Sequence, residues 1–392
     1  MRLHISQLKV GRYRGLAELS LEGLGRVNLL VGANNSGKTS ALEALSLSAA
    51  PLDPWEWMET ARRREPSPFP LSRRTMIERL RWLFPQQPAD ESGTLYSGTI
   101  DIAVGGTSPG RVLASYQELR SFLEPRSSQA TENGPDSPED EEAAAEDEDD
   151  EAALERRGAR IDIDLAPEQL TVPPSAPSTK ESFTWWEGER FVRPKRRVPL
   201  VRSQVVTPYD HWFRFLPPRM YADAQREGTA DALLSLLTRI DPRISGIEVL
   251  ATRREAPFQG NEAALYLRDK HAGLLPVEAF GDGMRRTLLM ALALRRARGG
   301  ILLVDEIETA IHVSALGLFF RWIVDSCASN DVQLFATTHS LEALDAILAA
   351  DTSSEEDIVA YRLEQHRGRT VAQRYGENLL KRLRLDRGAE VR

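Results

Sequence analysis

One eight-residue segment has the residue types and the spacing needed to bind phosphate groups. Gly32-Ala-Asn-Asn-Ser-Gly-Lys-Thr39 fits the pattern G-x-x-x-x-G-K-[ST] at every fixed position. Its glycines let successive backbone N–H groups point at phosphate oxygens, and a following helix adds its positive end. Lys38 is expected to span the β- and γ-phosphates, and the Thr39 hydroxyl is expected to ligate Mg²⁺. The predicted nucleotide-binding residues are Gly32, Asn34, Asn35, Ser36, Gly37, Lys38, Thr39 and Ser40.

Two acidic residues close an aliphatic run near the other end of the chain. Ile301-Leu-Leu-Val304 has the composition of a fully buried parallel strand, and Asp305 and Glu306 follow it directly. Such a strand delivers its last residues to the sheet edge beside a phosphate loop. We expect Asp305 to hold the Mg²⁺ shell through water and Glu306 to act as the general base for the attacking water. The alternative is a buried strand followed by two incidental capping acids.

A histidine ends a second buried strand of the same kind. His339 follows Leu334-Phe-Ala-Thr-Thr338 and comes 33 residues after Glu306, with one helix expected between them. At the tip of the neighbouring strand, His339 could reach the γ-phosphate or the attacking water, so we predict a catalytic role. The alternative is a residue that merely neighbours a helix cap.

A glycine-bearing loop opens the long apolar helix expected over Met284–Arg298. The loop reads Phe280-Gly-Asp-Gly-Met-Arg-Arg286. Backbone amides at a helix N-terminus suit an anion, and a plain helix-capping turn fits this sequence equally well.

The coarse pattern along the chain is that of an α/β protein with a large insertion. Strand, glycine loop and helix occupy Arg26–Ser48, after two shorter β-rich stretches, and strands and helices alternate again from 219. This alternation predicts a mostly parallel sheet with flanking helices. We therefore assign 1–50 and 219–375 to one core, 51–218 to an α+β insertion, and 376–392 to a basic helix and tail.

Charge and composition limit the class of protein. The net charge is −8, but residues 132–155 hold thirteen acidic side chains and no Lys or Arg, which leaves +5 on the rest. We expect the stretch 125–157 to be a disordered acidic loop. No apolar run is long enough to span a membrane, and Cys327 is the only cysteine, so we expect a cytoplasmic protein. Clustered arginines fit DNA phosphates, an acidic partner or a solvated surface.

Taken in order, these motifs resemble the ATP-binding-cassette (ABC) ATPases of the SMC, RecF and OLD type, and more closely prokaryotic AAA-family (AAA-15-like) ATPases. The opening Val10-Gly-Arg-Tyr-Arg-Gly-Leu16 is similar to a short element that precedes the phosphate loop in that group. The resemblance implies a P-loop NTPase fold of the ABC type, with ATP and Mg²⁺ as ligands. It further implies a signature loop in which Gly283 and Arg285 contact a nucleotide held by an opposite subunit, and a D-loop over Glu308–His312.

The sequence departs from that family pattern at two places. Gly281 stands where the signature serine is expected, and only Gln204 and Gln225 are candidates for the Q-loop glutamine. The chain also leaves no room for a Toprim nuclease domain or a long coiled-coil arm, so we expect any effector, such as a nuclease, to be a separate protein.

Three functions fit the sequence. The first is an ATPase that forms a homodimer, or a higher homo-oligomer, on ATP and serves DNA repair or defence against phage. The second is a nucleotide-dependent sensor with negligible hydrolysis that regulates a protein partner. The third, a transporter's cassette subunit, is disfavoured by Gly281 and by the lack of a clear coupling glutamine.

Overall fold

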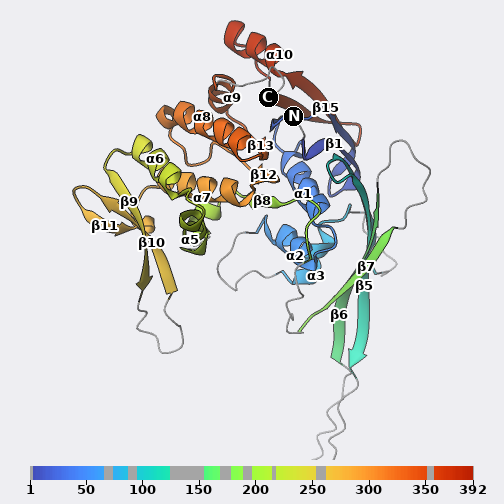
Figure 1. Ribbon diagram of the computed structural model, residues 1–392. Helices are drawn as coiled ribbons and strands as arrows, with labels where there is room; N and C mark the ends of the chain where they lie inside the picture. Colours follow the sequence, from blue (N-terminus) through green and yellow to red (C-terminus); the bar gives the residue numbers. More distant parts are fainter. Residues whose placement is uncertain are drawn as a thin grey trace, which may run out of the picture.

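The computed structural model describes residues 3–65, 74–86, 95–123, 154–167, 178–188, 197–213, 218–252, 262–350 and 357–391. Within these ranges the chain forms three sheets with helices packed around them (Figure 1). The expected acidic loop 125–157 lies outside the described residues, except for 154–157. Those four residues begin a strand and are therefore not part of a loop.

A six-stranded sheet forms the centre of the nucleotide-binding part. Its strand order is β15-β14-β3-β13-β12-β8, and all neighbours are parallel except the β14–β15 hairpin. The strands are β3 (Val27–Val31), β8 (Ser203–Val206), β12 (Ile301–Val304), β13 (Gln333–Thr337), β14 (Ile358–His366) and β15 (Arg369–Gly376). Every residue of β3, β12 and β13 is buried, which confirms the mostly parallel sheet expected from their continuous apolar runs.

The edge strand β8 lies within the range 51–218 that we expected to be an insertion. It pairs with β12 over all four of its residues. The chain therefore returns to the parallel sheet at Ser203, ahead of the expected position 219. A four-residue strand after a proline- and arginine-rich stretch gives too short a pattern to be recognised from sequence.

The second sheet is antiparallel and joins the N-terminal strands to most of the insertion. Its order is β2-β1-β4-β5-β6-β7. The strands are β1 (Ile5–Tyr13), β2 (Leu16–Glu22), β4 (Ser97–Gly106), β5 (Gly110–Leu123), β6 (Leu154–Ala166) and β7 (Thr179–Trp186). Because β4 pairs directly with β1, the insertion extends the N-terminal sheet and shares its core.

Helix α1 (Lys38–Ala49) lies between these two sheets, and eleven of its twelve residues are buried. The helices α2 (Pro54–Arg62) and α3 (Met76–Arg81) follow it on the same side. The opposite face of the parallel sheet is covered by α7 (Asp282–Arg296), α8 (Val313–Ser329) and α9 (Leu341–Leu348). The sheet is thus covered by helices on both faces, as an α/β fold requires.

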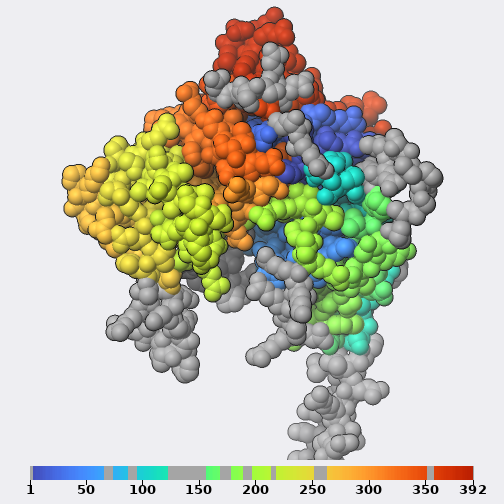
Figure 2. Space-filling model, viewed as in Figure 1, coloured from blue at the N-terminus to red at the C-terminus, as the bar shows by residue number. Residues whose placement is uncertain are grey.

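A smaller lobe packs against α7. It consists of a three-stranded sheet and two helices around their own apolar cluster. Its elements are α5 (Pro218–Arg226), α6 (Ala230–Ile240), β9 (Ile244–Thr252), β10 (Glu262–Asp269) and β11 (Gly273–Pro276). Figure 2 shows this lobe in yellow, beside the orange atoms of α8. The remaining elements are α4 (Asp210–Phe213), the 3₁₀ turn Val277–Ala279, α10 (Glu377–Lys381) and the π turn Arg382–Asp386.

Candidate active site

The phosphate loop connects β3 to α1 at the carboxyl edge of the parallel sheet. Gly32 has φ +137° and Gly37 has φ +99°, both in the region that favours glycine. A Cβ on Gly32 would lie 2.4 Å from the Leu363 carbonyl oxygen, and one on Gly37 would lie 2.4 Å from Leu16 Cδ2. The backbone can therefore adopt this curl only with glycine at both positions.

Lys38 and Ser36 line the inside of this loop. The Lys38 ammonium donates hydrogen bonds to the carbonyl oxygens of Gly32 (2.7 Å) and Ala33 (2.8 Å). Burial lowers the pKa of Lys38, while the carboxylates of Asp305, Glu306 and Glu308 act in the opposite direction. The Ser36 hydroxyl is buried and has no hydrogen-bond partner among the described residues. A phosphate oxygen would supply the missing partner, so the loop fits its expected ligand.

The carboxylate of Asp305 is held between two threonines. Thr39 Oγ1 donates to it at 3.1–3.2 Å, and Thr337 Oγ1 donates at 2.6 Å. Burial raises the pKa of Asp305, which both hydroxyl groups partly offset. A hydroxyl oxygen beside a half-buried carboxylate is a donor set that suits Mg²⁺, so Thr39 and Asp305 fit the predicted metal site.

Glu306 follows Asp305 with an unusual backbone conformation. Its φ is +46°, and its N–H donates to Thr337 Oγ1 at 2.8 Å. Its carboxylate accepts a hydrogen bond from Thr309 Oγ1 at 3.1 Å. A non-glycine residue in this region persists only where its surroundings hold it, and such residues cluster at active sites. Thr337 thus fixes both acids of the motif.

His339 follows β13, the strand that lies between β3, which leads into the phosphate loop, and β12, which leads to these acids. Its backbone N–H donates to Glu308 Oε1 at 2.9 Å, and the next N–H, of Ser340, donates to the same oxygen at 3.1 Å. The fold brings His339, Lys38 and Glu306 into the lining of one cavity of about 340 Å³. The cavity is lined by Arg14, Gly15, Asn34, Asn35, Ser36, Gly37, Lys38, Thr39, Ser40, Arg64, Asp305, Glu306, His339 and Gln365.

The glycine loop before α7 does not line this cavity within the described ranges. A Cβ on Gly283 would lie 2.9 Å from the Ala310 carbonyl oxygen, and Arg285 pairs with Asp282 at 3.3 Å. The two candidate Q-loop glutamines are also absent from the lining: Gln204 lies in β8 and Gln225 in α5. Gln365 lines the cavity instead, and no sequence motif indicated it.

A model of the family described as "AAA domain, putative AbiEii toxin, Type IV TA system" matches residues 27–345. The match runs from β3 to α9 and includes the phosphate loop, Asp305, Glu306 and His339. The chain belongs to this AAA-domain family. The family match agrees with the P-loop ATPase similar to the ABC, SMC and RecF kind that the motifs predicted.

Several proteins are similar to parts of this AAA-domain chain. An uncharacterized protein of Methanocaldococcus jannaschii is 36% identical over 101 residues, which are 26% of this chain and 80% of that protein. An ATP/GTP phosphatase of Helicobacter pylori is 29% identical over 76 residues, covering 19% and 20% of the two chains. The DNA replication and repair protein RecF of Acinetobacter baumannii is 47% identical over 47 residues, covering 12% and 13%. The chain thus spans only a small part of these last two relatives.

Solved SMC head domains are also similar to this AAA-domain chain over nearly all of its length. One, bound to the C-terminal winged-helix domain of ScpA, has a TM-score of 0.47 at 11% identity, covering 95% of this chain and 98% of that one. The head domain from Pyrococcus furiosus has a TM-score of 0.45 at 12% identity, covering 99% and 100%.

Arg286 is a residue of this AAA-domain protein whose role the sequence did not indicate. Its side chain is fully buried, and its guanidinium donates to the carbonyl oxygens of Thr207 (2.5 Å), Asp305 (3.2 Å) and Glu306 (3.2 Å). Burial lowers the pKa of Arg286 to about 10. Arg286 therefore connects the N-terminal part of α7 to the backbone of both acids and to the end of β8.

No helix in the described part of the chain is both long enough and apolar enough to cross a bilayer.

Proposed function

We propose that this protein hydrolyses ATP with Mg²⁺ in the cavity beside the phosphate loop. One observation carries the proposal: the Thr39 hydroxyl, the Asp305 carboxylate, the Thr337 hydroxyl and the Glu306 N–H form a continuous hydrogen-bonded chain at the end of that loop. This series of hydrogen bonds supports a role in which the phosphate-binding groups, the metal-binding groups and the proposed general base, Glu306, are positioned together.

Thr39 Oγ1 and Asp305 would hold the metal, Asp305 through water. When bound, Mg²⁺ neutralises charge on the β- and γ-phosphates. Lys38 would give up its contacts with the loop carbonyls to reach the phosphate oxygens. The Ser36 hydroxyl, which has no partner among the described residues, would donate a hydrogen bond to them.

Glu306 is proposed to accept a proton from the water that attacks the γ-phosphate. Its backbone is held by Thr337 and Arg286, and its carboxylate accepts a hydrogen bond from Thr309 Oγ1 at 3.1 Å. His339 is proposed to contact the γ-phosphate or the attacking water. Each role matches the position of the side chain in the cavity lining.

A second copy of the chain is proposed to complete the site. Gly283 and Arg285 do not line the cavity of their own chain in the described ranges, which is the arrangement expected if they contact a nucleotide held by a partner copy. ATP would then join two chains, and hydrolysis would separate them. We propose that this cycle drives a separate effector in DNA repair or in defence against phage; the match to a DNA-repair protein supports this setting.

The test is steady-state ATP hydrolysis by the wild type, Lys38→Ala and Glu306→Gln, with and without duplex DNA, together with the mass in solution at saturating ATP. We expect both variants to lose hydrolysis and Glu306→Gln to accumulate as an ATP-bound dimer. Unchanged hydrolysis in Glu306→Gln would show that another group is the base. ATP binding without turnover in the wild type would favour a sensor instead.

A further inference from the structure

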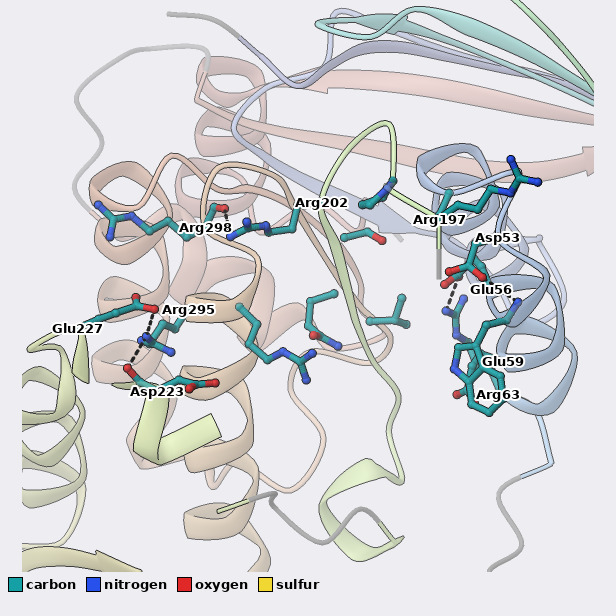
Figure 3. Close-up of a pocket in the computed structure, with 17 residues that line it drawn as sticks. Asp53, Glu56, Glu59, Arg63, Arg197, Arg202, Asp223, Glu227, Arg295 and Arg298 are labelled. Carbon is teal, nitrogen blue, oxygen red and sulfur yellow. Dashed lines mark hydrogen bonds and ion pairs between the residues drawn. The ribbon is translucent and has the colours of Figure 1, made fainter. Parts of the chain in front are cut away.

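A pocket of about 660 Å³ lies beside the edge strand β8, between α2 and α7 (Figure 3). Several of the charged side chains that line it pair with one another. Glu56 pairs with Arg63 at 2.6 Å, and Arg295 pairs with Glu227 at 2.5 Å and donates to the Asp223 carbonyl oxygen at 2.7 Å. These contacts stabilise α2 and join the end of α5 to α7, so they have a structural role.

Gln365 differs, because its side chain lines the nucleotide cavity and has no role in the hydrolysis proposed above. It lies near the end of β14, three positions after Arg362, which pairs with Val31 at the end of β3. In the sheet order β14-β3-β13-β12, β14 and β12 lie on opposite sides of β3. At the carboxyl edge, Gln365 therefore lies on the other side of β3 from the strand that leads to Asp305 and Glu306.

This side of the phosphate loop is where the nucleoside of a bound ATP is expected. The γ-phosphate must lie near the metal and the attacking water, which the proposed function assigns to Asp305 and Glu306, so the ribose extends from the opposite end of the triphosphate. The turn between β1 and β2 lies on this side, since Gly15 lines the cavity and Ala17 N–H donates to Thr370 Oγ1 at 3.4 Å. The end of β14 and this turn thus form the nucleoside end of the cavity.

Thr370 fixes the orientation of the Gln365 amide. The Thr370 side chain is buried, and its hydroxyl oxygen accepts hydrogen bonds from Gln365 Nε2 at 2.9 Å and from the backbone of Ala17. The amide nitrogen is thus engaged by β15. In the part of the chain that the structure describes, no donor bonds to the carbonyl oxygen of the same amide, Oε1. That oxygen is available to accept a hydrogen bond from a ligand.

Among the groups of ATP, the ribose hydroxyls are the hydrogen-bond donors closest to the phosphates. Phosphate oxygens are acceptors, so they cannot donate to Oε1. A Cβ on Gly37, at the N-cap of α1, would lie 3.8 Å from Gln365 Nε2. The backbone N–H groups at this helix end are the groups expected to hold the phosphates. A side chain this near to them reaches the sugar, which is joined directly to the α-phosphate, before it reaches the base.

We propose that Gln365 Oε1 accepts a hydrogen bond from a ribose hydroxyl of the bound nucleotide, and that Thr370 positions the amide for this contact. The site then disfavours nucleotides whose sugar lacks this hydroxyl, so a ribonucleotide binds more tightly than the corresponding deoxyribonucleotide. The inference rests on the nucleotide binding of the proposed function and is independent of hydrolysis.

The test is isothermal titration calorimetry of the full chain with Mg²⁺ and ADP, 2′-deoxy-ADP, 3′-deoxy-ADP or IDP, because these diphosphates carry no γ-phosphate to be hydrolysed. We expect one of the two deoxynucleotides to bind the wild type about fivefold more weakly than ADP, through the loss of one neutral hydrogen bond. Gln365→Leu should bind ADP and that deoxynucleotide with affinities equal within about twofold. Gln373→Leu, at an exposed position on β15 of the same hairpin, is the matched control and should keep the wild-type ratio.

The positioning role of Thr370 is tested by the same ratio of affinities. Thr370→Val removes the acceptor of the Gln365 amide, so we expect the preference for ADP over the deoxynucleotide to fall to within about twofold. Thr370→Ser keeps the hydroxyl and should retain the preference. A purely structural role would weaken the binding of all four nucleotides equally and leave the ratio unchanged, which would reject the positioning.

An equal preference in the wild type and Gln365→Leu would overturn the proposal. If Gln365→Leu changes only the ratio of ADP to IDP, which differ in the base, the contact is with the base and the assignment to the ribose is wrong. Lys38→Ala separates this failure from that of the proposed function. ADP binding that Lys38→Ala weakens, with no effect of Gln365→Leu, rejects this inference alone, whereas a wild type that binds none of the nucleotides rejects both.

Discussion

Glu308 fixes the backbone of His339, because its Oε1 atom accepts the His339 N–H at 2.9 Å. The two residues lie 31 positions apart, one after β12 and the other after β13. The position of the histidine beside the phosphate loop thus depends on a carboxylate from the neighbouring loop.

Replacement of Glu308 should therefore reduce turnover more than ATP binding. In Glu308→Ala the N–H groups of His339 and Ser340 lose their acceptor, and we expect kcat to fall about tenfold with a small change in KM. Glu308→Gln keeps an acceptor oxygen and should retain most of the activity. Glu278→Ala, at an exposed position away from the cavity, is the control. Equal kcat values for Glu308→Ala and wild type would contradict this positioning role.

The Thr39 hydroxyl should determine how the enzyme responds to Mg²⁺. Thr39→Val keeps the shape of the side chain but removes the hydroxyl, so we expect kcat to fall about 100-fold at saturating Mg²⁺. Thr39→Ser keeps the hydroxyl and should need at most a modestly higher Mg²⁺ concentration. Hydrolysis rates across a Mg²⁺ titration measure both effects. A Thr39→Val enzyme with a wild-type Mg²⁺ curve would show that this hydroxyl is not a ligand.

Loss of the buried guanidinium of Arg286 should destabilise the fold. Arg286→Met leaves the carbonyl oxygens of Thr207, Asp305 and Glu306 without this donor, and we expect the free energy of unfolding to fall by about 3 kcal/mol. Urea unfolding without nucleotide measures the change. Arg321→Met, at an exposed position on α8, should change it by less than about 0.5 kcal/mol. Similar unfolding curves for the two variants would refute this assignment.

A side chain at Gly32 should damage the phosphate loop. The alanine Cβ would meet the Leu363 carbonyl oxygen at 2.4 Å, and φ +137° is unfavourable for alanine. We expect Gly32→Ala to lose at least about tenfold in ATP affinity and about 2 kcal/mol in stability. Gly317→Ala is the control, since its Cβ would meet nothing within 4 Å. Titration with a fluorescent ATP analogue and thermal unfolding give the two values.

Cys327 should react with thiol reagents only when the protein unfolds. Burial raises the pKa of this thiol to about 12 from an ordinary value of 9.0. Because the folded state holds the proton more tightly, the thiol's contribution to stability is complete below pH 9 and is lost as the pH rises toward 12. At pH 8 we expect labelling by a disulfide reagent to follow the unfolding rate, and urea should accelerate it. Rapid labelling without denaturant would show that the thiol is accessible.

The motifs expected to bind and hydrolyse ATP were recognisable in the sequence because each is contiguous. The phosphate loop has a fixed local spacing between a buried strand and a helix, and Asp305 and Glu306 directly follow four aliphatic residues. These local patterns determine which residues reach the carboxyl edge of the sheet. They also predicted the parallel core, since β3, β12 and β13 are short, fully buried apolar runs.

Only the tertiary structure decided which groups hold those motifs in place. The contacts of Arg286 span 19 to 79 positions, and those of Glu308 span 31 and 32, so no local pattern contains them. The same holds for the pocket at β8, because residues of α2 and of α7 that line it lie more than 200 positions apart. A side chain that bonds to a distant backbone carbonyl leaves no periodicity or spacing in the sequence. The sequence therefore determined the chemistry of the site, and the packing of distant segments determined its geometry.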